Sequence, residues 1–510
     1  NLLDKCTAYP KTTAIVGLIP VIFAVLLFKF GVKQKFFPEA ERNQFVIELW
    51  LPTGTNLNAT EKATEKLEAL IKNDKRVVNY TTFIGTSSPR FYYNFAPEFP
   101  VTNYAQILLN TTDIAAAEEL TEELAGKIEN VVPEGSPQIR LMQQGKPLKA
   151  PVEVQIWGDN ISFLKSIAQQ VDCIISNTQG SVYIRNDFKE DYYGLDIQLK
   201  PEAERLGFTT ESVAKSVYAG FSGADITTIR EGNKAVKVVF QLDENARQTT
   251  NDINKIYLAS PATGANVPLE QIAELKPVWK TGRIMHRNGV RMLTVQSNTQ
   301  GKVLASEILQ KIQPEISKLT LPEGYKITYG GEYKNKQETF PEMIGVLGIS
   351  LILIFFTLLF QFRNLKEAII IMLTIPLAMF GAMLGLFITG NNFGFTAFVG
   401  VISLSGVVVR NAIILIDHIH ELVKHHGMDL RTATIETGKR RFRPIFLTAM
   451  AAAIGVLPMI LSGSPMWSPL ASVIAFGVVI ELINGLLWVP AVYLLWVVPK
   501  SEKNNKLDNE

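Results

Sequence analysis

The residue that is hardest to place in this sequence is Arg410, which lies inside an apolar run from about Phe393 to Leu422. A run of that length can cross a bilayer as a helix, and a cation at its centre costs roughly 2.5–3.5 kcal/mol even on lenient scales. An acidic partner would offset this cost, and Glu481 lies at a similar depth in another apolar run. Because arginine stays protonated, the carboxylate would have to bind and release any proton.

Three further polar residues extend this candidate proton-coupling set. Asn411 is adjacent to Arg410, Thr448 lies about one turn into another run, and Asp417 lies two turns after Arg410 on roughly the same helical face. Simpler explanations stay open for each charged group. Arg410 could extend its side chain to the membrane surface, Asp417 could lie at a solvated helix end, and Glu481 could be a structural hydrogen-bonding group.

Other kinds of chemistry find little support in the sequence. Four histidines flank the end of the same run and could suggest a metal site: His418, His420, His425 and His426. They have no cysteine nearby and no strict ligand spacing, so we expect no metal site. The two cysteines, Cys6 and Cys173, lie in different regions, and we expect no disulfide between them. The sequence has no motif for phosphate binding, nucleophilic catalysis or zinc hydrolysis, which argues against an ATP-driven protein.

A loop from about Gly85 to Tyr104 is rich in aromatic residues and prolines. Its aromatic residues are Phe91, Tyr92, Tyr93, Phe95, Phe99 and Tyr104, and its prolines are Pro89, Pro97 and Pro100. Aromatic loops often line pockets for apolar ligands, which suggests a binding site here. The alternative is a loop that covers its own small core.

The composition indicates a chain that is partly embedded in a membrane. It has 510 residues, of which 47% are hydrophobic, and a mean hydropathy of +0.15. Its net charge of +2 gives no reason to expect nucleic acid binding. One apolar run precedes a soluble region of about 300 residues and five follow it. The runs are about Thr13–Phe30, Phe340–Phe362, Ala368–Ile388, Phe393–Leu422, Pro444–Leu461 and Leu470–Val498.

Basic residues in the short connections between these runs predict the orientation. They occur in alternate connections and in the tail: Arg363, Lys366, Lys424, Arg431, Lys439, Arg440, Arg441, Arg443, Lys500, Lys503 and Lys506. The opposite connections contain neither lysine nor arginine. We therefore expect both ends of the chain to be cytoplasmic and the soluble region, about 31–338, to lie across the membrane. Pro444 suits the first turn of the helix that follows it.

The soluble region has the pattern of an α+β fold with a repeated strand–helix–strand unit. The expected copies are Gln44–Ile84, Tyr104–Met142, Val152–Ile184 and Met292–Tyr329. Units of this kind resemble ferredoxin-like subdomains. An insert at about 193–289 separates the last two copies, which we expect to pack as one subdomain.

This arrangement resembles the C-terminal half of a resistance-nodulation-division (RND) efflux transporter of the hydrophobe/amphiphile type. The resemblance covers essentially the whole chain. Its most specific segments are Phe36-Phe37-Pro38, Pro52-Thr53-Gly54-Thr55, Leu321–Tyr325, Gly331-Glu332, Gly406–Asp417 and Arg441–Thr448. It implies an α-helical membrane domain of six transmembrane helices, resembling spans 7–12 of the family. It also implies a large α+β periplasmic region of ferredoxin-like subdomains with a docking insert.

The resemblance also implies a division of the chain. Residues 1–35 would form a cytoplasmic segment and the first transmembrane helix, and residues 36–150 the first porter subdomain. Residues 151–192 and 290–335 would form the second porter subdomain, with 193–289 as the docking subdomain. Residues 336–498 would form five transmembrane helices, and 499–510 a cytoplasmic tail.

Residue roles carried over from the family concern proton coupling and substrate contact. Arg410 stands where drug exporters of the family usually have a relay lysine, and here it can act only as a counter-charge. Thr448 matches a relay threonine, and Arg441 matches a basic residue at the cytoplasmic end of the same span. Glu481 stands where the family usually has a small residue. The implied substrate-contacting residues are Phe83, Phe91, Tyr92, Tyr93 and Phe95.

The paired aspartates of the family lie in its N-terminal half, so we expect this chain to be inactive without that half, on the same or a separate chain. With it, the resemblance implies a secondary transporter, not an enzyme, that exports amphiphilic compounds from a Gram-negative inner membrane. A proton gradient would drive it, without a cofactor. The expected partners are the lipid bilayer, further copies in a homotrimer, a periplasmic adaptor and an outer-membrane channel.

Two alternatives stay open. A metal-ion exporter of the same superfamily would, for copper or silver, call for methionines in its pocket. The soluble region has few, such as Met142, Met285 and Met292, and they are not clustered in the sequence. A membrane scaffold or export accessory that does not itself transport would have the same architecture and would not need Arg410.

Overall fold

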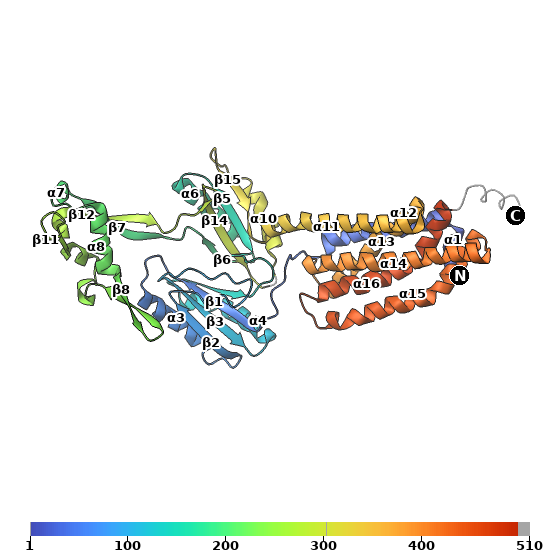
Figure 1. Ribbon diagram of the computed structural model, residues 1–510, viewed down its shortest axis with the longest axis horizontal. Helices are drawn as coiled ribbons and strands as arrows, with labels where there is room; N and C mark the ends of the chain where they lie inside the picture. Colours follow the sequence, from blue (N-terminus) through green and yellow to red (C-terminus); the bar gives the residue numbers. More distant parts are fainter. Residues whose placement is uncertain (1, 302, 498–510) are drawn as a thin grey trace. The chain divides into compact units, whose positions relative to one another are not determined.

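The computed structural model describes residues 2–301 and 303–497 (Figure 1). These residues form two compact units. The smaller unit consists of Pro52–Gly54 and Phe188–Ile284, and the larger unit contains the other described residues. Most of the insert expected at about 193–289 lies in the smaller unit. The expected tail, 499–510, with Lys500, Lys503 and Lys506, lies outside the described residues.

Six segments of the described chain are long and apolar enough to cross a membrane, as the sequence predicts. The short helix α1 (Leu2–Ala8) precedes them. The six membrane segments are α2 (Pro10–Leu26) with the π-helical turn η1 (Leu27–Gly31), α11 (Gly331–Phe362), α12 (Leu365–Met372) with α13 (Thr374–Thr389), α14 (Phe395–His426), α15 (Leu430–Leu461) and α16 (Ser468–Trp496).

Two of these helices begin well before the apolar runs that predict them. Helix α11 begins at Gly331, and α15 begins at Leu430, where the Asp429 side chain accepts the backbone N–H of Thr432 at 3.4 Å. Pro444 was expected in a first helical turn, and this prediction is wrong because Pro444 lies inside α15. Hydropathy detects only the apolar part of a helix, so polar turns that continue it into solvent go unnoticed.

Helices α13, α14 and α16 form the buried centre of the bundle, whereas α2, α11 and α15 are largely exposed. Small residues let α13 and α16 approach closely, as is common in membrane bundles. A Cβ atom on Gly381 would lie 2.5 Å from the carbonyl oxygen of Phe476, and one on Gly385 would lie 2.7 Å from that of Ser472. Neither position has room for a side chain.

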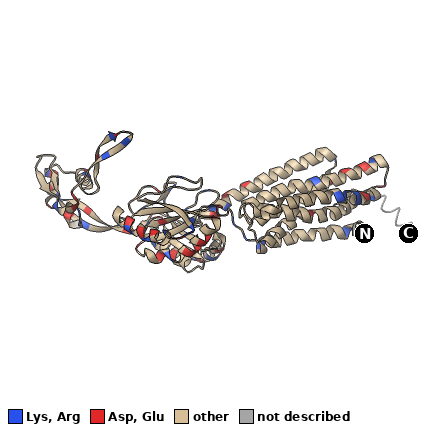
Figure 2. Cartoon of the chain, turned by 90° about the horizontal axis from the view of Figure 1, so that it is seen from below, with Lys and Arg blue, Asp and Glu red and all other residues tan. Residues whose placement is uncertain are grey.

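The helix connections that are rich in lysine and arginine lie at the end of the bundle where the chain begins (Figure 2). There Lys439 on α15 lies 3.7 Å from Asp4 on α1, and the Lys366 ammonium donates to the carbonyl oxygen of Trp496 at 3.0 Å. We call this the basic end of the bundle.

At the opposite end, a short β-bridge joins the segment after α2 to the segment before α14. The Phe393 N–H donates to the carbonyl oxygen of Lys33 at 2.8 Å, and the Lys35 N–H donates to that of Phe393 at 3.3 Å. The adjacent Gly394 has no room for a side chain, because its Cβ would lie 2.3 Å from the Lys35 carbonyl oxygen. The two segments are therefore held backbone to backbone.

The first sheet of the soluble region is antiparallel, with the strand order β2-β3-β1-β4. Its strands are β1 (Gln44–Trp50), β2 (Val77–Ile84), β3 (Tyr104–Thr111) and β4 (Ser136–Leu141), and its helices are α3 (Leu57–Ile71), α4 (Ile114–Ala125) and α5 (Ile128–Val131). Alternate strand residues such as Phe45, Ile47 and Leu49 pack with these helices in one core. Asn56 caps α3 by accepting the N–H of Ala59 at 2.8 Å.

The second sheet contains strands from both sides of the insert. It comprises β5 (Val152–Trp157), β6 (Ser181–Asn186), β13 (His286–Arg287), β14 (Val290–Thr299) and β15 (Lys326–Tyr329), next to the helices α6 (Ile161–Ser176) and α10 (Ala305–Ile316). Strand β14 pairs with β5 and also with β6. Strands of the last two predicted repeats therefore share one sheet.

The smaller unit is built on a long antiparallel ribbon of β7 (Asp191–Leu199) and β12 (Ala273–Thr281). Its other strands are β8 (Ala224–Glu231), β9 (Lys234–Phe240), β10 (Tyr257–Ala259) and β11 (Asn266–Pro268). Its helices are α7 (Pro201–Arg205), α8 (Thr210–Ser222) and α9 (Leu269–Ile272), with 3₁₀ turns at Glu244–Ala246 and Thr250–Lys255. Phe208, Leu269 and Ile272 lie in its core.

Candidate functional site

The membrane bundle contains a buried polar pair between α14 and α16. The Asn411 side-chain amide donates to Glu481 Oε2 at 2.9 Å, and only 5% of Asn411 and 2% of Glu481 are exposed. Gly485 makes room for the carboxylate, because a Cβ there would lie 2.6 Å from Glu481 Oε1. A cavity of about 10 Å³ adjoins the pair, close to the smallest volume that holds one water molecule. The pair is thus enclosed between two helices, and a role of Glu481 in proton coupling stays a prediction.

Arg410 points away from this pair. Successive residues of an α-helix are turned by about 100°, so the burial of Asn411 leaves Arg410 on the exposed face of α14. Arg410 makes no ion pair with any described residue. The structure therefore does not bring Arg410 together with Glu481, which was the acidic residue that the sequence placed at a similar depth.

Two other predicted coupling residues are exposed with Arg410 on the outside of the bundle. Asp417 lies two turns further along the exposed face of α14. Thr448 is exposed on α15, and its hydroxyl donates to the carbonyl oxygen of Ile445 in its own helix at 3.0 Å. We call the side of α14 that carries Arg410 and Asp417 the exposed polar face, whereas Thr448 belongs to a different helix. Their roles in proton coupling stay predictions.

Arg441 lies near the basic end, next to one of the four histidines. One guanidinium nitrogen of Arg441 lies 3.3 Å from His418 Nδ1, which also lies 2.8 Å from Glu421 Oε2. In the described part of the chain, no three His, Cys, Asp or Glu side chains converge as metal ligands would. Sequence reasoning missed Glu367 and Tyr493, which contact His420. Glu367 was overlooked because it directly precedes the apolar run that begins at Ala368, where an acidic residue is expected to be solvated.

In the soluble region, the aromatic loop folds back onto the first sheet. Phe95 is 3% exposed, lies 4.9 Å from Phe91 between ring centroids, and has the Arg140 guanidinium 5.5 Å from its ring centre. The Arg42 guanidinium lies 4.8 Å from the ring of Tyr92. These contacts favour the alternative that the loop covers its own core.

Two other aromatic residues of the predicted substrate site are placed differently. The Tyr93 hydroxyl donates to Gln144 Oε1 at 2.8 Å and accepts from the N–H of Gly145 at 3.0 Å, which anchors the loop. Phe83 is half-buried on the edge strand β2 and pairs with Gln106 of β3. Substrate contact by Phe83, Phe91, Tyr92, Tyr93 and Phe95 stays a prediction.

The helix-free faces of the two sheets carry polar residues rather than a second apolar core. Gln106 and Gln138 of the first sheet are 0% and 3% exposed, and Arg140 forms an ion pair with Glu48 at 2.9 Å. Arg185 on β6 donates to the Lys149 carbonyl oxygen at 2.8 Å. Burial lowers the pKa of Arg185 to about 10, while the nearby carboxylate of Glu48 acts in the opposite direction.

Carboxylate and amide oxygens of the second sheet face the same polar interior. Glu153 and Gln155 lie on β5, and Gln155 and Gln296 are 5% and 6% exposed. Burial raises the pKa of Glu153, the charge of Asp187 raises it further, and the charge of Arg185 lowers it. The interior between the sheets therefore contains several oxygen atoms that could bind a cation, together with two arginines.

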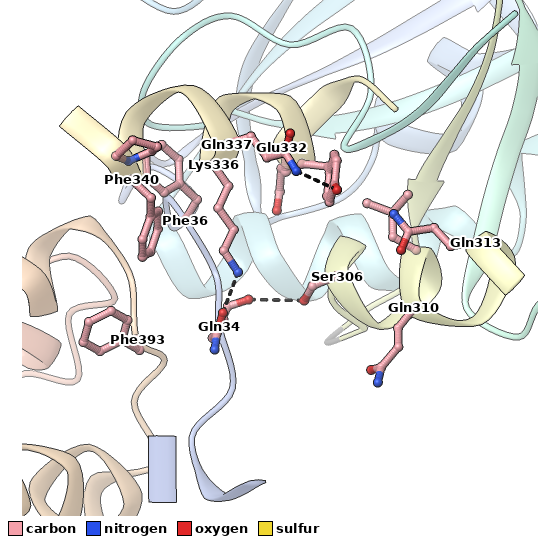
Figure 3. Close-up of a pocket in the computed structure, with 13 residues that line it drawn as sticks. Gln34, Phe36, Ser306, Gln310, Gln313, Glu332, Lys336, Gln337, Phe340 and Phe393 are labelled. Atoms are coloured by element: carbon pink, nitrogen blue, oxygen red, sulfur yellow. Dashed lines mark hydrogen bonds between the residues drawn. The ribbon is translucent and has the colours of Figure 1, made fainter. Parts of the chain in front are cut away.

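A larger pocket of about 590 Å³ lies where α10 approaches the start of α11 (Figure 3). Figure 3 shows aromatic rings on one side and side-chain amides on the other, with Lys336 between them. The Lys336 ammonium donates to the side-chain oxygen of Gln34, and the Ser306 hydroxyl donates to the Gln34 carbonyl oxygen at 3.2 Å. Its aromatic side is formed by Phe36, Phe340 and Phe393, and its amide side by Gln310 and Gln313. The pocket is thus amphipathic and large enough for a small molecule.

A family model and several known proteins match almost the whole chain. The sequence model of the AcrB/AcrD/AcrF family matches residues 1–497. The cobalt-zinc-cadmium resistance protein CzcA of Cupriavidus metallidurans is 25% identical over 97% of this chain and 48% of its own length. The nickel-cobalt-cadmium resistance protein NccA of Alcaligenes xylosoxydans xylosoxydans is 26% identical over 96% of this chain and 47% of its own length.

The fold is also that of a solved structure. The crystal structure of a heavy metal efflux pump superposes with a TM-score of 0.79 at 22% identity, covering 97% of this chain and 51% of the pump chain. The chain spans about half the length of the curated relatives it matches.

Proposed function

Because the chain belongs to the AcrB/AcrD/AcrF family of RND transporters, we propose that it forms half of an efflux transporter for divalent metal cations. Members of this family are secondary transporters, not enzymes, and the six apolar helices fit a multi-pass inner-membrane protein. The observation that carries the proposal is that relatives named for resistance to cobalt, zinc, nickel and cadmium match 96–97% of the chain. Those relatives do not support the expected export of amphiphiles, and they favour the metal alternative.

The polar interior between the two sheets is the proposed path of the cation. Carboxylate and amide oxygens, such as those of Glu48, Glu153 and Gln155, are ligands that suit divalent cations better than monovalent copper, which favours sulfur. Arg140 pairs with Glu48 at 2.9 Å and would have to move aside before a cation could replace it. In this proposal the path opens when the sheets separate.

The remaining half of the transporter would pack against the exposed polar face. Arg410 has no ion pair among the described residues, and an exposed cation in the middle of an apolar helix needs a carboxylate partner. The resemblance places paired aspartates in the N-terminal half, which would supply this partner from the same or a separate chain. In this proposal the basic end is cytoplasmic, the sheets lie in the periplasm, and homotrimers work with an adaptor and an outer-membrane channel.

Protons would enter the mechanism at two places in the bundle. Arg410 stays charged and serves as the fixed counter-charge of the aspartates. Glu481 can take up a proton and release it, and its protonation changes what the Asn411 amide binds. Since Asn411 and Arg410 are neighbours on α14, protonation of Glu481 and protonation of the aspartates would both act on this helix.

The test measures transport by the complete transporter in liposomes that contain a zinc-sensitive dye. An imposed proton gradient is expected to drive zinc or cobalt across the membrane. Glu153→Gln and Glu48→Gln should each slow this flux, and Gln198→Ala, on the exposed ribbon of the smaller unit, serves as the matched surface control. Absence of any proton-dependent metal flux from an assembled transporter would refute the proposal.

The amphipathic pocket supports a second candidate, export of amphiphilic compounds. Its rings at Phe36, Phe340 and Phe393 suit an apolar body, and Lys336 suits an anionic group. A fluorescent amphiphile assayed in the same liposomes separates the two candidates. Amphiphile flux that falls in Phe340→Ala, without metal flux, would favour this second function.

A further inference from the structure

A second buried acid lies at the basic end, where three membrane helices meet. Glu367 on α12 is 2% exposed. Its Oε1 lies 3.0 Å from His420 Nε2 on α14 and 3.3 Å from the Tyr493 hydroxyl on α16. The hydroxyl also lies 3.3 Å from His420 Nε2, so the three groups form a closed triangle. We call Glu367, His420 and Tyr493 the basic-end cluster.

The cluster has an unusual balance of donors and acceptors. The second carboxylate oxygen, Glu367 Oε2, is buried and has no hydrogen-bond partner in the described part of the chain. Buried polar atoms rarely stay unpaired, and a buried carboxyl group with one unpaired oxygen is less costly to keep neutral than to keep charged. His420 is 28% exposed at its side chain and connects the acid to solvent. A proton can therefore arrive at the imidazole and pass to the carboxylate.

Other charges near the cluster do not neutralise Glu367. Lys366 directs its ammonium to the carbonyl oxygen of Trp496, and Arg363 is exposed at the end of α11. Helix α13 has no charged residue, and the nearest titratable group on α16 is Tyr493 itself. The remaining charged or titratable residues on this part of α14 lie at its surface or bind elsewhere: Asp417, His418, Glu421 and Lys424.

We propose that the basic-end cluster is a second proton-binding site, which exchanges protons with the aqueous phase at this end of the bundle. Its ligand is a proton shared between Glu367 and His420 and oriented by the Tyr493 hydroxyl. Transfer needs no further reactant: the Nε2–H bond of a protonated His420 breaks, an O–H bond forms on Glu367 Oε1, and both side chains become neutral. Reversal returns the proton to solvent.

This site is distinct from the Asn411–Glu481 pair. His420 lies nine residues after Asn411 on α14, or about 14 Å along the helix axis, which is too far for a direct hydrogen bond. Both sites nevertheless bridge α14 and α16. The existence of the second site does not depend on transport, and only its part in transport rests on the proposed proton-driven function.

The experiment is a pH titration of the complete transporter in lipid, followed by difference infrared spectroscopy. The C=O stretching band of protonated carboxylic acids reports Glu367 directly. We expect a component of this band to titrate in the wild type and to disappear in Glu367→Gln, which preserves shape and hydrogen bonding. His420→Gln and Tyr493→Phe should each shift its midpoint by about one pH unit or more, because each removes a hydrogen-bonding partner.

A matched control is His425→Gln, which changes an exposed histidine on the same helix and should leave the midpoint unchanged. A band that persists in Glu367→Gln overturns the proposal, as does a midpoint that moves in neither His420→Gln nor Tyr493→Phe. Metal flux measured on the same samples distinguishes failure of the proposed proton-binding site from failure of the proposed transport function. A titrating site without proton-driven flux supports the cluster and refutes the proposed function, whereas flux without a titrating Glu367 does the reverse.

Discussion

Replacing Asn411 by alanine removes the amide that donates to Glu481. An unpaired buried polar group costs about 1–3 kcal/mol, whereas measured couplings between membrane helices average about 0.6 and reach about 1.7 kcal/mol. The 2.9 Å bond and the burial of both residues place this pair in the upper part of that range. We therefore expect a double-mutant cycle of Asn411→Ala and Glu481→Ala to yield a coupling of about 1–1.7 kcal/mol.

The assay is the free energy of unfolding of the complete transporter in detergent micelles, measured for the wild type, both single variants and the double variant. Asn484→Ala provides the matched control, since Asn484 lies one turn from Glu481 on α16 and its buried amide nitrogen has no described partner. Its cycle with Glu481→Ala should give a coupling within about 0.5 kcal/mol of zero. A coupling at Asn411 no larger than that at Asn484 would refute the assigned pairing.

Three further predictions concern the scaffold. Gly381→Ala should lower the melting temperature, because the added Cβ would lie 2.5 Å from the backbone oxygen of Phe476, while Gly455→Ala, with open space around it, should not. Asn56→Ala removes the cap of α3 and should cost about 1 kcal/mol in the free energy of unfolding, whereas Asn56→Asp should retain most of it. Burial raises the pKa of Glu153, so this residue stabilises the fold most at low pH and loses that contribution as the pH rises through the raised pKa. Glu153→Gln should therefore gain in melting temperature over the wild type as the pH is raised from about 4 to 7, and a constant difference would contradict the cause assigned to the shift.

The sequence predicts the membrane helices well because hydropathy depends only on local composition. Every apolar run corresponds to a helical segment. The errors occur where a helix continues beyond the apolar stretch, as at Leu430, fourteen residues before Pro444. The break at Leu373, which divides one predicted span into two helices, lies about one turn before Pro376. Proline lacks the N–H donor and its ring clashes with the preceding turn, so this break could have been predicted from the sequence.

The candidate sites are less accessible to sequence reasoning, because they depend on which way a helix faces. Arg410 and Asn411 are neighbours in sequence, yet only Asn411 reaches Glu481. The basic-end cluster joins Glu367 to Tyr493 across 126 positions of sequence, and no local pattern connects them. The scarcity of methionines argued only against copper or silver, and it does not bear on cations that bind oxygen ligands.

The backbone bridge between Phe393 and the Lys33–Lys35 segment has a mechanical consequence. Helix α14 carries Arg410 and Asn411, and its first turn is fastened to the strand of chain that leads from α2 into β1. Because Gly394 has no side chain, the two segments lie in direct backbone contact. A displacement of α14 along its axis would therefore also move the segment that leads into the first sheet.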